Sequence, residues 1–117
     1  LGKELLKVHK SYLYIIQTSL KKFKVNSFSH ITGGGIEGNT KRVIPKNLKL
    51  EVDWSSWKRP LIFNLIQNKG SVSENVMRET FNLGIGLIAI LPSGIADKYC
   101  DFWNSKKEKC FIIGSIH

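Results

Sequence analysis

The chain contains the stretch Leu48-Lys49-Leu50-Glu51-Val52-Asp53-Trp54, in which apolar and polar side chains alternate without a break. Because successive side chains of a β-strand point to opposite faces, this alternation predicts a strand with one buried face and one face in water. A second strand is predicted from 84 to 91, which is apolar throughout, as in a strand covered on both faces. Further strands are predicted at 27–31 and 110–116, and the last of them is expected to be buried.

Between these strands the apolar residues recur at the period of a helix. The N-terminal segment predicts a long amphipathic helix whose apolar face carries Leu5, Val8, Tyr12, Ile16, Leu20 and Phe23. Shorter helices are predicted from 36 to 43, after Pro60, after Ser73 and from 92 to 105. Helices and strands interleave, which predicts an α/β (α+β) fold with a mixed sheet flanked by helices.

The length of 117 residues suits one domain, and residues 1–117 are predicted to form a single compact unit. No apolar run approaches the roughly 18 residues of a membrane span, and no signal-peptide pattern is visible, so we expect a cytoplasmic protein without membrane contact. Cys100 and Cys110 lack the spacing of a metal site. They are expected to be reduced thiols, with a disulfide between them as the alternative.

The net charge of +9 comes mostly from lysines spread along the chain. A phosphate-bearing metabolite, a nucleic acid or a solvated lysine-rich surface can each explain such a charge. No signature of an RNA- or DNA-binding module is present, so no nucleic-acid partner is expected. The acidic residues are scattered, and the chain has neither a P-loop motif nor a Ser-His-Asp or Cys-His set. We therefore predict no metal site and no complete catalytic apparatus.

A run of three glycines lies between the strand predicted at 27–31 and the helix predicted at 36–43. Consecutive glycines mark backbone that adopts positive φ or approaches another group closely. Free N–H groups at the start of a helix bind anions, and arginine suits phosphate bidentately. We therefore predict a phosphate-binding site, with a flexible turn as the alternative. Its candidate residues are His30, Thr32, Gly33, Gly34, Gly35, Asn39 and Arg42.

Two further segments combine aromatic or polar residues with turns. Residues 53–60 place Trp54 and Trp57 beside two cations, which predicts core packing at a strand-to-helix turn, with a base-stacking surface as the alternative. Residues 80–86 form a second glycine-containing turn, from which Asn82 can reach a cleft. These segments add one candidate site residue, Asn82.

Three segments of the chain carry patterns that belong together. Residues 30–45 carry HITGGG followed by N-x-K-R-x-x-P, residues 56–63 carry SW-x-x-P-x-x-F, and residues 77–87 carry M-x-x-TFN-x-GIG-L. In this combination the chain resembles the phosphoribosylformylglycinamidine cyclo-ligase (aminoimidazole ribonucleotide synthetase) family. It departs from the family pattern at Lys41, where a proline is usual, and at Gly38, where a glutamate is usual.

The resemblance implies the C-terminal domain of a two-domain ligase, which converts formylglycinamidine ribonucleotide and ATP into aminoimidazole ribonucleotide, ADP and phosphate in purine biosynthesis. It implies that ATP and Mg²⁺ bind mainly to an N-terminal domain outside this chain. It also implies that the complete enzyme is a homodimer and that this domain alone is inactive. Two alternatives stay open. One is another ATP-using member of the superfamily, of the formylglycinamidine synthase or selenophosphate synthetase type. The other is a non-catalytic phosphate- or nucleic-acid-binding module.

Overall fold

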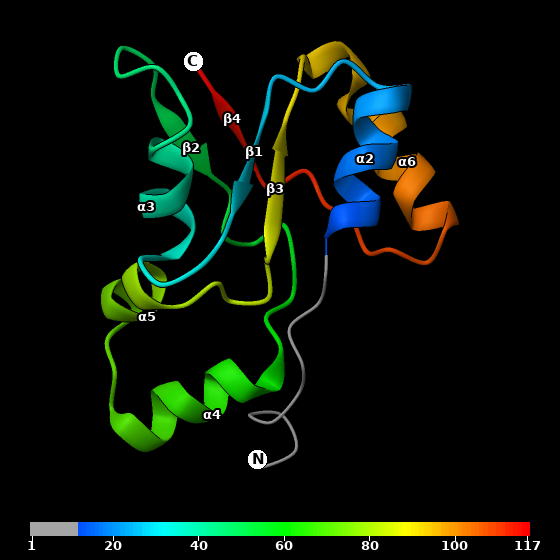
Figure 1. Ribbon diagram of the computed structural model, residues 1–117. Coiled ribbons are helices and arrows are strands. Elements are labelled where there is room, and N and C mark those ends of the chain that lie inside the picture. Colours follow the sequence, from blue (N-terminus) through cyan, green and yellow to red (C-terminus); the bar gives the residue numbers. More distant parts are fainter. Residues whose placement is uncertain (1–11) are drawn as a thin grey trace.

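The computed structural model describes residues 12–117, and Figure 1 shows how its helices and strands are arranged. In chain order the elements are α2 (Leu13–Lys22), β1 (Ser27–His30), α3 (Gly35–Lys41), β2 (Leu50–Val52), α4 (Leu61–Gly70), α5 (Glu74–Thr80), β3 (Leu87–Ile90), the 3-10 turn η1 (Ser93–Ile95), α6 (Ala96–Ser105) and β4 (Gly114–Ile116). Helices and short antiparallel strands make up this part of the chain, so the predicted α+β class is confirmed. No helix within residues 12–117 combines the length and the apolarity that crossing a membrane requires.

The strands form two separate antiparallel pairs, β1 with β3 and β2 with β4. His30 at the end of β1 lies opposite Leu87 at the start of β3. The backbone N–H of Ile31 donates to the carbonyl oxygen of Gly86 at 2.9 Å. The chain therefore enters β3 at the end where it leaves β1, and β3 must run back antiparallel to it. For residues 12–117 the single mixed sheet that the sequence predicts is thus wrong.

The main core lies where α3 and α5 meet the segment around Trp57. Trp57 is 7% exposed, and its indole Nε1 donates to the carbonyl oxygen of Leu83 at 3.0 Å. This arrangement supports the core-packing interpretation of Trp57. The buried members of the core are Ile31, Ile36, Trp57, Met77, Leu83 and Ile85.

A second layer is made by α2 and α6, which lie side by side on the opposite side of β1 and β3 from α3 (Figure 1). The buried hydroxyl of Ser19 on α2 is hydrogen-bonded to the Tyr99 hydroxyl on α6 at 2.9 Å. The ring of Phe23 packs edge-on against Tyr99 and Phe102, with centroid distances of 5.1 and 5.6 Å. Aromatic edge-to-face contacts therefore hold this pair of helices together.

The amphipathic N-terminal helix is confirmed over Leu13–Lys22, whereas Leu5 and Val8 lie outside the described residues. Within α2, Ser19 is fully buried but Leu20 is 58% exposed, so the predicted burial of Leu20 is wrong. Ser19 faces α6, and the next residue of a helix lies about 100° further around the axis, which points Leu20 toward solvent. The helices predicted after Pro60 and Ser73 are confirmed as α4 and α5, and the Ser73 side chain accepts from the Val76 N–H.

Three strands are clearly shorter than their sequence patterns. The strand predicted over 48–54 is present only as Leu50–Val52, where Leu50 and Val52 are partly buried and Glu51 is exposed. The strand predicted from 84 to 91 is present only over Leu87–Ile90. Gly84 has a φ of 99°, which an extended strand excludes, and the Ile85 N–H donates to the Asn82 carbonyl oxygen at 3.0 Å, so this part of the segment forms a turn. The C-terminal strand β4 has three residues, of which Gly114 and Ser115 are exposed, so its predicted burial is wrong. In the described part of the chain β4 pairs only with the equally short β2, which leaves it at an edge.

Candidate functional site

The glycine loop between β1 and α3 has a defined backbone. Gly34 and Gly35 have φ of 103° and 75°, in the left-handed region that favours glycine. A Cβ placed on Gly35 would lie 2.0 Å from the carbonyl oxygen of Arg78. Glycine is therefore needed at Gly34 for the turn into α3, and at Gly35 both for this turn and for the backbone contact between α3 and α5.

Asn39 holds this loop from the inside. Its side chain is buried, and its Nδ2 donates to the carbonyl oxygen of Gly35 at 2.7 Å, with longer bonds to those of Thr32 at 3.2 Å and Gly33 at 3.4 Å. Its Oδ1 accepts from the Thr32 hydroxyl at 3.1 Å. Asn39 thus contributes to the site by fixing the shape of the loop, because its amide is occupied by loop backbone.

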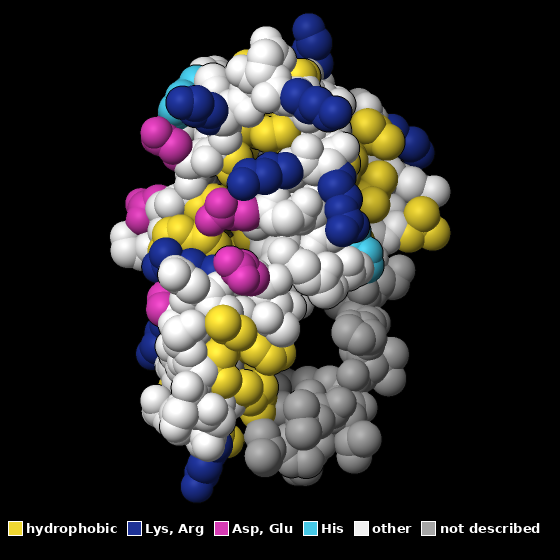
Figure 2. All heavy atoms as spheres, turned by 90° about the vertical axis from the view of Figure 1, so that its left-hand side faces the viewer, with side chains coloured by type: hydrophobic (Ala, Val, Ile, Leu, Met, Phe, Trp, Pro, Cys, Tyr) yellow, Lys and Arg dark blue, Asp and Glu magenta, His cyan; other side chains and the backbone are white. Residues whose placement is uncertain are grey.

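A cavity of about 320 Å³ opens beside the loop, between α3 and α5. Gly34 and Gly38 bring backbone to its wall, and the side chains around it are polar or charged. Figure 2, which looks onto this side of the molecule, shows cationic and acidic side chains next to one another. The lining residues are Gly34, Glu37, Gly38, Lys41, Asn75, Arg78 and Glu79.

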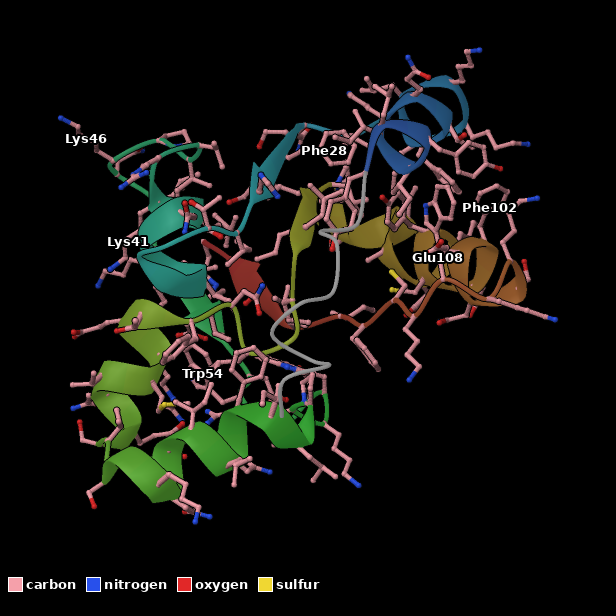
Figure 3. All side chains as sticks on the ribbon, turned by 60° about the horizontal axis from the view of Figure 1, so that its bottom comes forward. Phe28, Lys41, Lys46, Trp54, Phe102 and Glu108 are labelled. Atoms are coloured by element: carbon pink, nitrogen blue, oxygen red, sulfur yellow. The ribbon has the colours of Figure 1, made fainter. Side chains whose placement is uncertain are left out.

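The two cations of the cavity differ in how firmly they are held. Lys41 is exposed and lies 3.8 Å from the Glu37 carboxylate, a loose contact between consecutive turns of α3. Arg78 is held on two sides, because its Nε donates to Glu74 at 2.9 Å and its guanidinium lies 4.3 Å from the centre of the Trp54 ring. Trp54 is labelled in Figure 3, close to α4 and α5. Lys41 is therefore the cation that can move toward a ligand, and Arg78 is a fixed positive charge.

Glu74 joins Arg59 and Arg78 into one hydrogen-bonded network next to the cavity, whose lining includes Arg78. Besides Arg78 it accepts from both terminal nitrogens of Arg59, one of them at 3.0 Å, and from Gln67 at 3.4 Å. The hydrogen bonds from Arg59 are the main cause that lowers the pKa of Glu74 from 4.5 to about 2. The carboxylate is thus ionised at neutral pH, and it ties the segment before α4 to α5.

The structure brings together only part of the site that the sequence predicts. Thr32, Gly33 and Gly35 are all hydrogen-bonded to Asn39 in one loop, which also contains Gly34. His30 is exposed and packs edge-on against Tyr12, with 5.9 Å between ring centroids. Arg42 is exposed directly after α3, and its N–H donates to the Asn39 carbonyl at 3.3 Å. Neither His30 nor Arg42 is among the residues that line the cavity.

The Asn82 side chain stabilises the turn in which it lies. Its Oδ1 accepts from the N–H of Gly84 at 2.9 Å, and Asn82 is not among the residues that line the cavity. Lys41, Asn75 and Arg78 do line it, although the sequence reasoning did not select them. Asn75 and Arg78 belong to α5, which is far from the glycine loop in sequence. No local sequence pattern predicts that α5 packs beside α3. The contact between Gly35 and Arg78 is what brings them together.

No group of three or more His, Cys, Asp or Glu side chains suited to a metal ion occurs within residues 12–117. The acidic groups near the cavity are Glu37 and Glu79, together with Glu74 in the network next to it. The cavity lining therefore combines two cations, Lys41 and Arg78, with two carboxylates, Glu37 and Glu79, beside the glycine backbone of the loop.

Comparison with known proteins gives the chain its relatives. It is 40% identical over 116 residues to a protein of Thermoanaerobacter sp. (strain X514) named phosphoribosylformylglycinamidine cyclo-ligase, which covers 99% of this chain and 34% of that protein. It is 41% identical over 114 residues to the protein of the same name from Thermodesulfovibrio yellowstonii, covering 97% of this chain and 33% of that one. The chain therefore spans about a third of the length of these curated relatives. The family model described as AIR synthase related protein, C-terminal domain, matches residues 1–117. The chain belongs to this family of AIR synthase related C-terminal domains.

Proposed function

We propose that this chain is the substrate-binding C-terminal domain of a phosphoribosylformylglycinamidine cyclo-ligase, and that the glycine loop with its adjoining cavity holds the substrate phosphate. The observation that carries the proposal is the locked loop, in which Asn39 fixes a left-handed Gly34-Gly35 backbone beside a cavity with Lys41 and Arg78. Identity of about 40% to proteins with that name over nearly the whole chain supports the assignment.

The proposed role of this chain is binding and orientation. Backbone N–H groups of the loop donate to the phosphate oxygens, and Lys41 on the cavity wall neutralises their charge. Arg42, which is exposed and lies outside the cavity lining, adds a second cation by turning its side chain toward the bound phosphate. Arg78 stays paired with Glu74 and adds a fixed positive field. Because these donors are held in place before the ligand arrives, binding does not require the loop to become ordered.

The proposed reaction closes the imidazole ring of formylglycinamidine ribonucleotide and yields aminoimidazole ribonucleotide, ADP and phosphate. ATP would supply the phosphoryl group that activates the formyl oxygen of the substrate. We assign ATP and Mg²⁺ mainly to the N-terminal domain of the complete enzyme, as the resemblance to the cyclo-ligase family implies. The complete enzyme is proposed to be a cytoplasmic homodimer with the substrate between its two domains.

A domain exchange tests the activity. This chain replaces the matching third of the Thermodesulfovibrio yellowstonii cyclo-ligase, and the formation of aminoimidazole ribonucleotide is measured with formylglycinamidine ribonucleotide and ATP. We expect turnover that depends on both compounds. A folded chimera that binds ATP and forms no product contradicts the proposal, and product from a different amide substrate favours another member of the superfamily.

Single substitutions in the active chimera test the binding site. Lys41→Ala and Arg42→Ala are each expected to raise KM for the ribonucleotide about tenfold and to leave kcat nearly unchanged, since they remove contacts made equally in the ground and transition states. Lys46→Ala is the matched control, because Lys46 is an exposed cation that projects away from the cavity (Figure 3). An unchanged KM in the Arg42→Ala variant would show that Arg42 does not contact the ribonucleotide.

A salt titration separates the proposal from the nucleic-acid-binding alternative that the charge of +9 raises. Binding of a single ribose phosphate neutralises few charges, whereas binding along many phosphates weakens steeply with salt. Ribonucleotide binding with a shallow dependence on salt is the expected result. Tight, steeply salt-dependent binding of a short RNA or DNA duplex, with no binding of the ribonucleotide, contradicts it.

A further inference from the structure

The two cysteines of the chain meet beside the middle of α6. Cys100 lies on α6 and Cys110 in the segment that leads to β4, and their sulfur atoms are 3.2 Å apart. Figure 3 shows the two sulfurs next to each other near the labelled Glu108. Both residues are free cysteines and half-buried. Only a small closing movement separates this contact from a sulfur–sulfur bond of about 2.05 Å.

The Asn104 side chain holds the Cys110 backbone through two hydrogen bonds, which we call the Asn104 clamp, and neither bond involves a sulfur atom. The Asn104 side chain accepts from the Cys110 N–H at 3.0 Å, and its Nδ2 donates to the Cys110 carbonyl at 3.1 Å. Cys100 and Asn104 stand four residues apart on α6, so they lie on one face of the helix. The clamp therefore sets the backbone of Cys110 opposite Cys100 while both thiols are still reduced.

We propose that Cys100 and Cys110 are a redox modification site, in which a peroxide converts the two thiols into a reversible intramolecular disulfide. In the first step the Cys100 sulfur attacks hydrogen peroxide, which gives a sulfenic acid and one water. In the second step the Cys110 sulfur attacks the Cys100 sulfur and a second water leaves. Two thiols and one peroxide thus give one disulfide and two waters, with two electrons passing from sulfur to oxygen.

The order of these steps follows from the environment of Cys110. Burial, followed by its contact with Cys100, raises the pKa of the Cys110 thiol to about 12. Since the thiolate is the nucleophile, Cys110 is a poor first attacker at neutral pH. Geometry makes Cys110 the resolving thiol, because its sulfur already lies 3.2 Å from the Cys100 sulfur and attack on a sulfenic acid there is intramolecular, which offsets its small thiolate fraction.

The disulfide would couple the two layers of the fold. The helix α6 packs on α2 through Tyr99. The segment after Cys110 instead runs toward β2, where the Asp53 N–H donates to the Ile113 carbonyl oxygen at 2.7 Å. A bond between Cys100 and Cys110 closes the turn that joins these layers. Closing a loop of this length restricts the unfolded chain and is expected to shift the unfolding equilibrium on the order of 100-fold toward the folded state.

The test compares the reduced and the peroxide-treated whole chain. After reduction and removal of the reductant, one equivalent of hydrogen peroxide is added, and free thiols, intact mass and Tm are measured. We expect both thiols to disappear, the mass to fall by two hydrogen atoms, the protein to remain a monomer on a non-reducing gel, and the Tm to rise by several degrees. Dithiothreitol should reverse the changes in thiol content, mass and Tm.

Two variants sharpen the result. Cys110→Ser keeps the first thiol and removes the resolving one, so peroxide should leave a sulfenic or more oxidised Cys100 and no increase in Tm. Asn104→Ala keeps both thiols and removes the clamp, so disulfide formation should be markedly slower than in the wild type. The reduced wild-type chain serves as its own reference, which keeps the test decisive even where a variant fails to fold.

Three outcomes overturn the proposal. They are persistence of both free thiols after treatment, oxidation to sulfinic acids without a disulfide, and disulfides that form only between chains. None of them bears on the proposed ligase function, which is measured separately by ribonucleotide turnover.

Discussion

The α-carbon of Gly35 lies directly against the backbone carbonyl oxygen of Arg78, so closely that a Cβ there would stand 2.0 Å from that oxygen. This contact joins the start of α3 to α5. It places the glycine loop at the mouth of the cavity and brings Asn75 and Arg78 into its lining. The candidate site thus depends on one backbone-to-backbone approach that only glycine permits.

Gly35→Ala is expected to destabilise the fold by about 2 kcal/mol or more, because the new methyl group collides with the Arg78 carbonyl at a φ of 75°. Gly33→Ala is the matched control, since a Cβ at Gly33 has no atom within 4 Å and its φ is not left-handed. Its effect should stay within about 0.5 kcal/mol. Urea denaturation measures both, and equal midpoints for the two variants would contradict the role of the contact.

Asn39→Ala is expected to cost about 2 kcal/mol, because it leaves buried loop carbonyls without their donor. Asn39→Asp should cost at least as much, since its carboxylate would face the carbonyl oxygen of Gly35. Asn82→Ala removes a single hydrogen bond to Gly84 in an exposed turn and should cost about 1 kcal/mol or less. The urea midpoints of the three variants give the order. An Asn39→Ala protein as stable as Asn82→Ala contradicts the prediction.

The Glu74 network predicts acid sensitivity. The pKa of Glu74 is lowered from 4.5 to about 2 in the folded chain, so between these values the unfolded state binds more protons and stability falls as pH falls. Because the Glu74 side chain is 40% exposed and solvent screens it, we expect a contribution of about 1 kcal/mol at neutral pH. Glu74→Gln should be less stable than the wild type at neutral pH, and the difference should vanish as the pH approaches 2. Urea unfolding over this pH range measures it, and a difference that is independent of pH would rule the network out.

The hydrogen bond between Ser19 and Tyr99 links α2 to α6 at 2.9 Å in a buried setting. A double-mutant cycle with Ser19→Ala and Tyr99→Phe should give a coupling energy of about 1 kcal/mol. Ser19→Ala leaves the Tyr99 hydroxyl without its partner, and Tyr99→Phe leaves the Ser19 hydroxyl without its partner. The double variant removes both hydroxyls. Additive effects in thermal or urea unfolding would show that the two hydroxyls do not interact.

Local patterns in the sequence predicted the helices well. The Ser73 cap, the position of Pro60 before α4 and the periodic apolar residues of α6 depend on groups only a few residues apart, and the structure confirms all three elements. The glycine run likewise predicted backbone that needs positive φ, which Gly34 and Gly35 have. Such features are decided by the conformational limits of single residues and their neighbours.

Pairing between distant segments could not be predicted in the same way. A period of two shows that a segment is extended but not which strand lies beside it, so the mixed sheet was expected where two antiparallel pairs exist. The lining of the cavity was missed for the same reason, since Arg78 reaches the loop only through the contact of its carbonyl with Gly35.

The sequence by itself determined the α+β class, most of the helices, the glycine loop and membership in the family, because each rests on local conformation or on residue identity along the chain. Tertiary structure alone decided three things. Asn39 holds the glycine loop by hydrogen bonds, Lys41 and Arg78 line the cavity, and the Cys100 and Cys110 sulfurs lie in contact. The physical reason is that these relationships arise from side-chain direction and from packing between elements, which follow from the burial of the whole core and which no short pattern encodes.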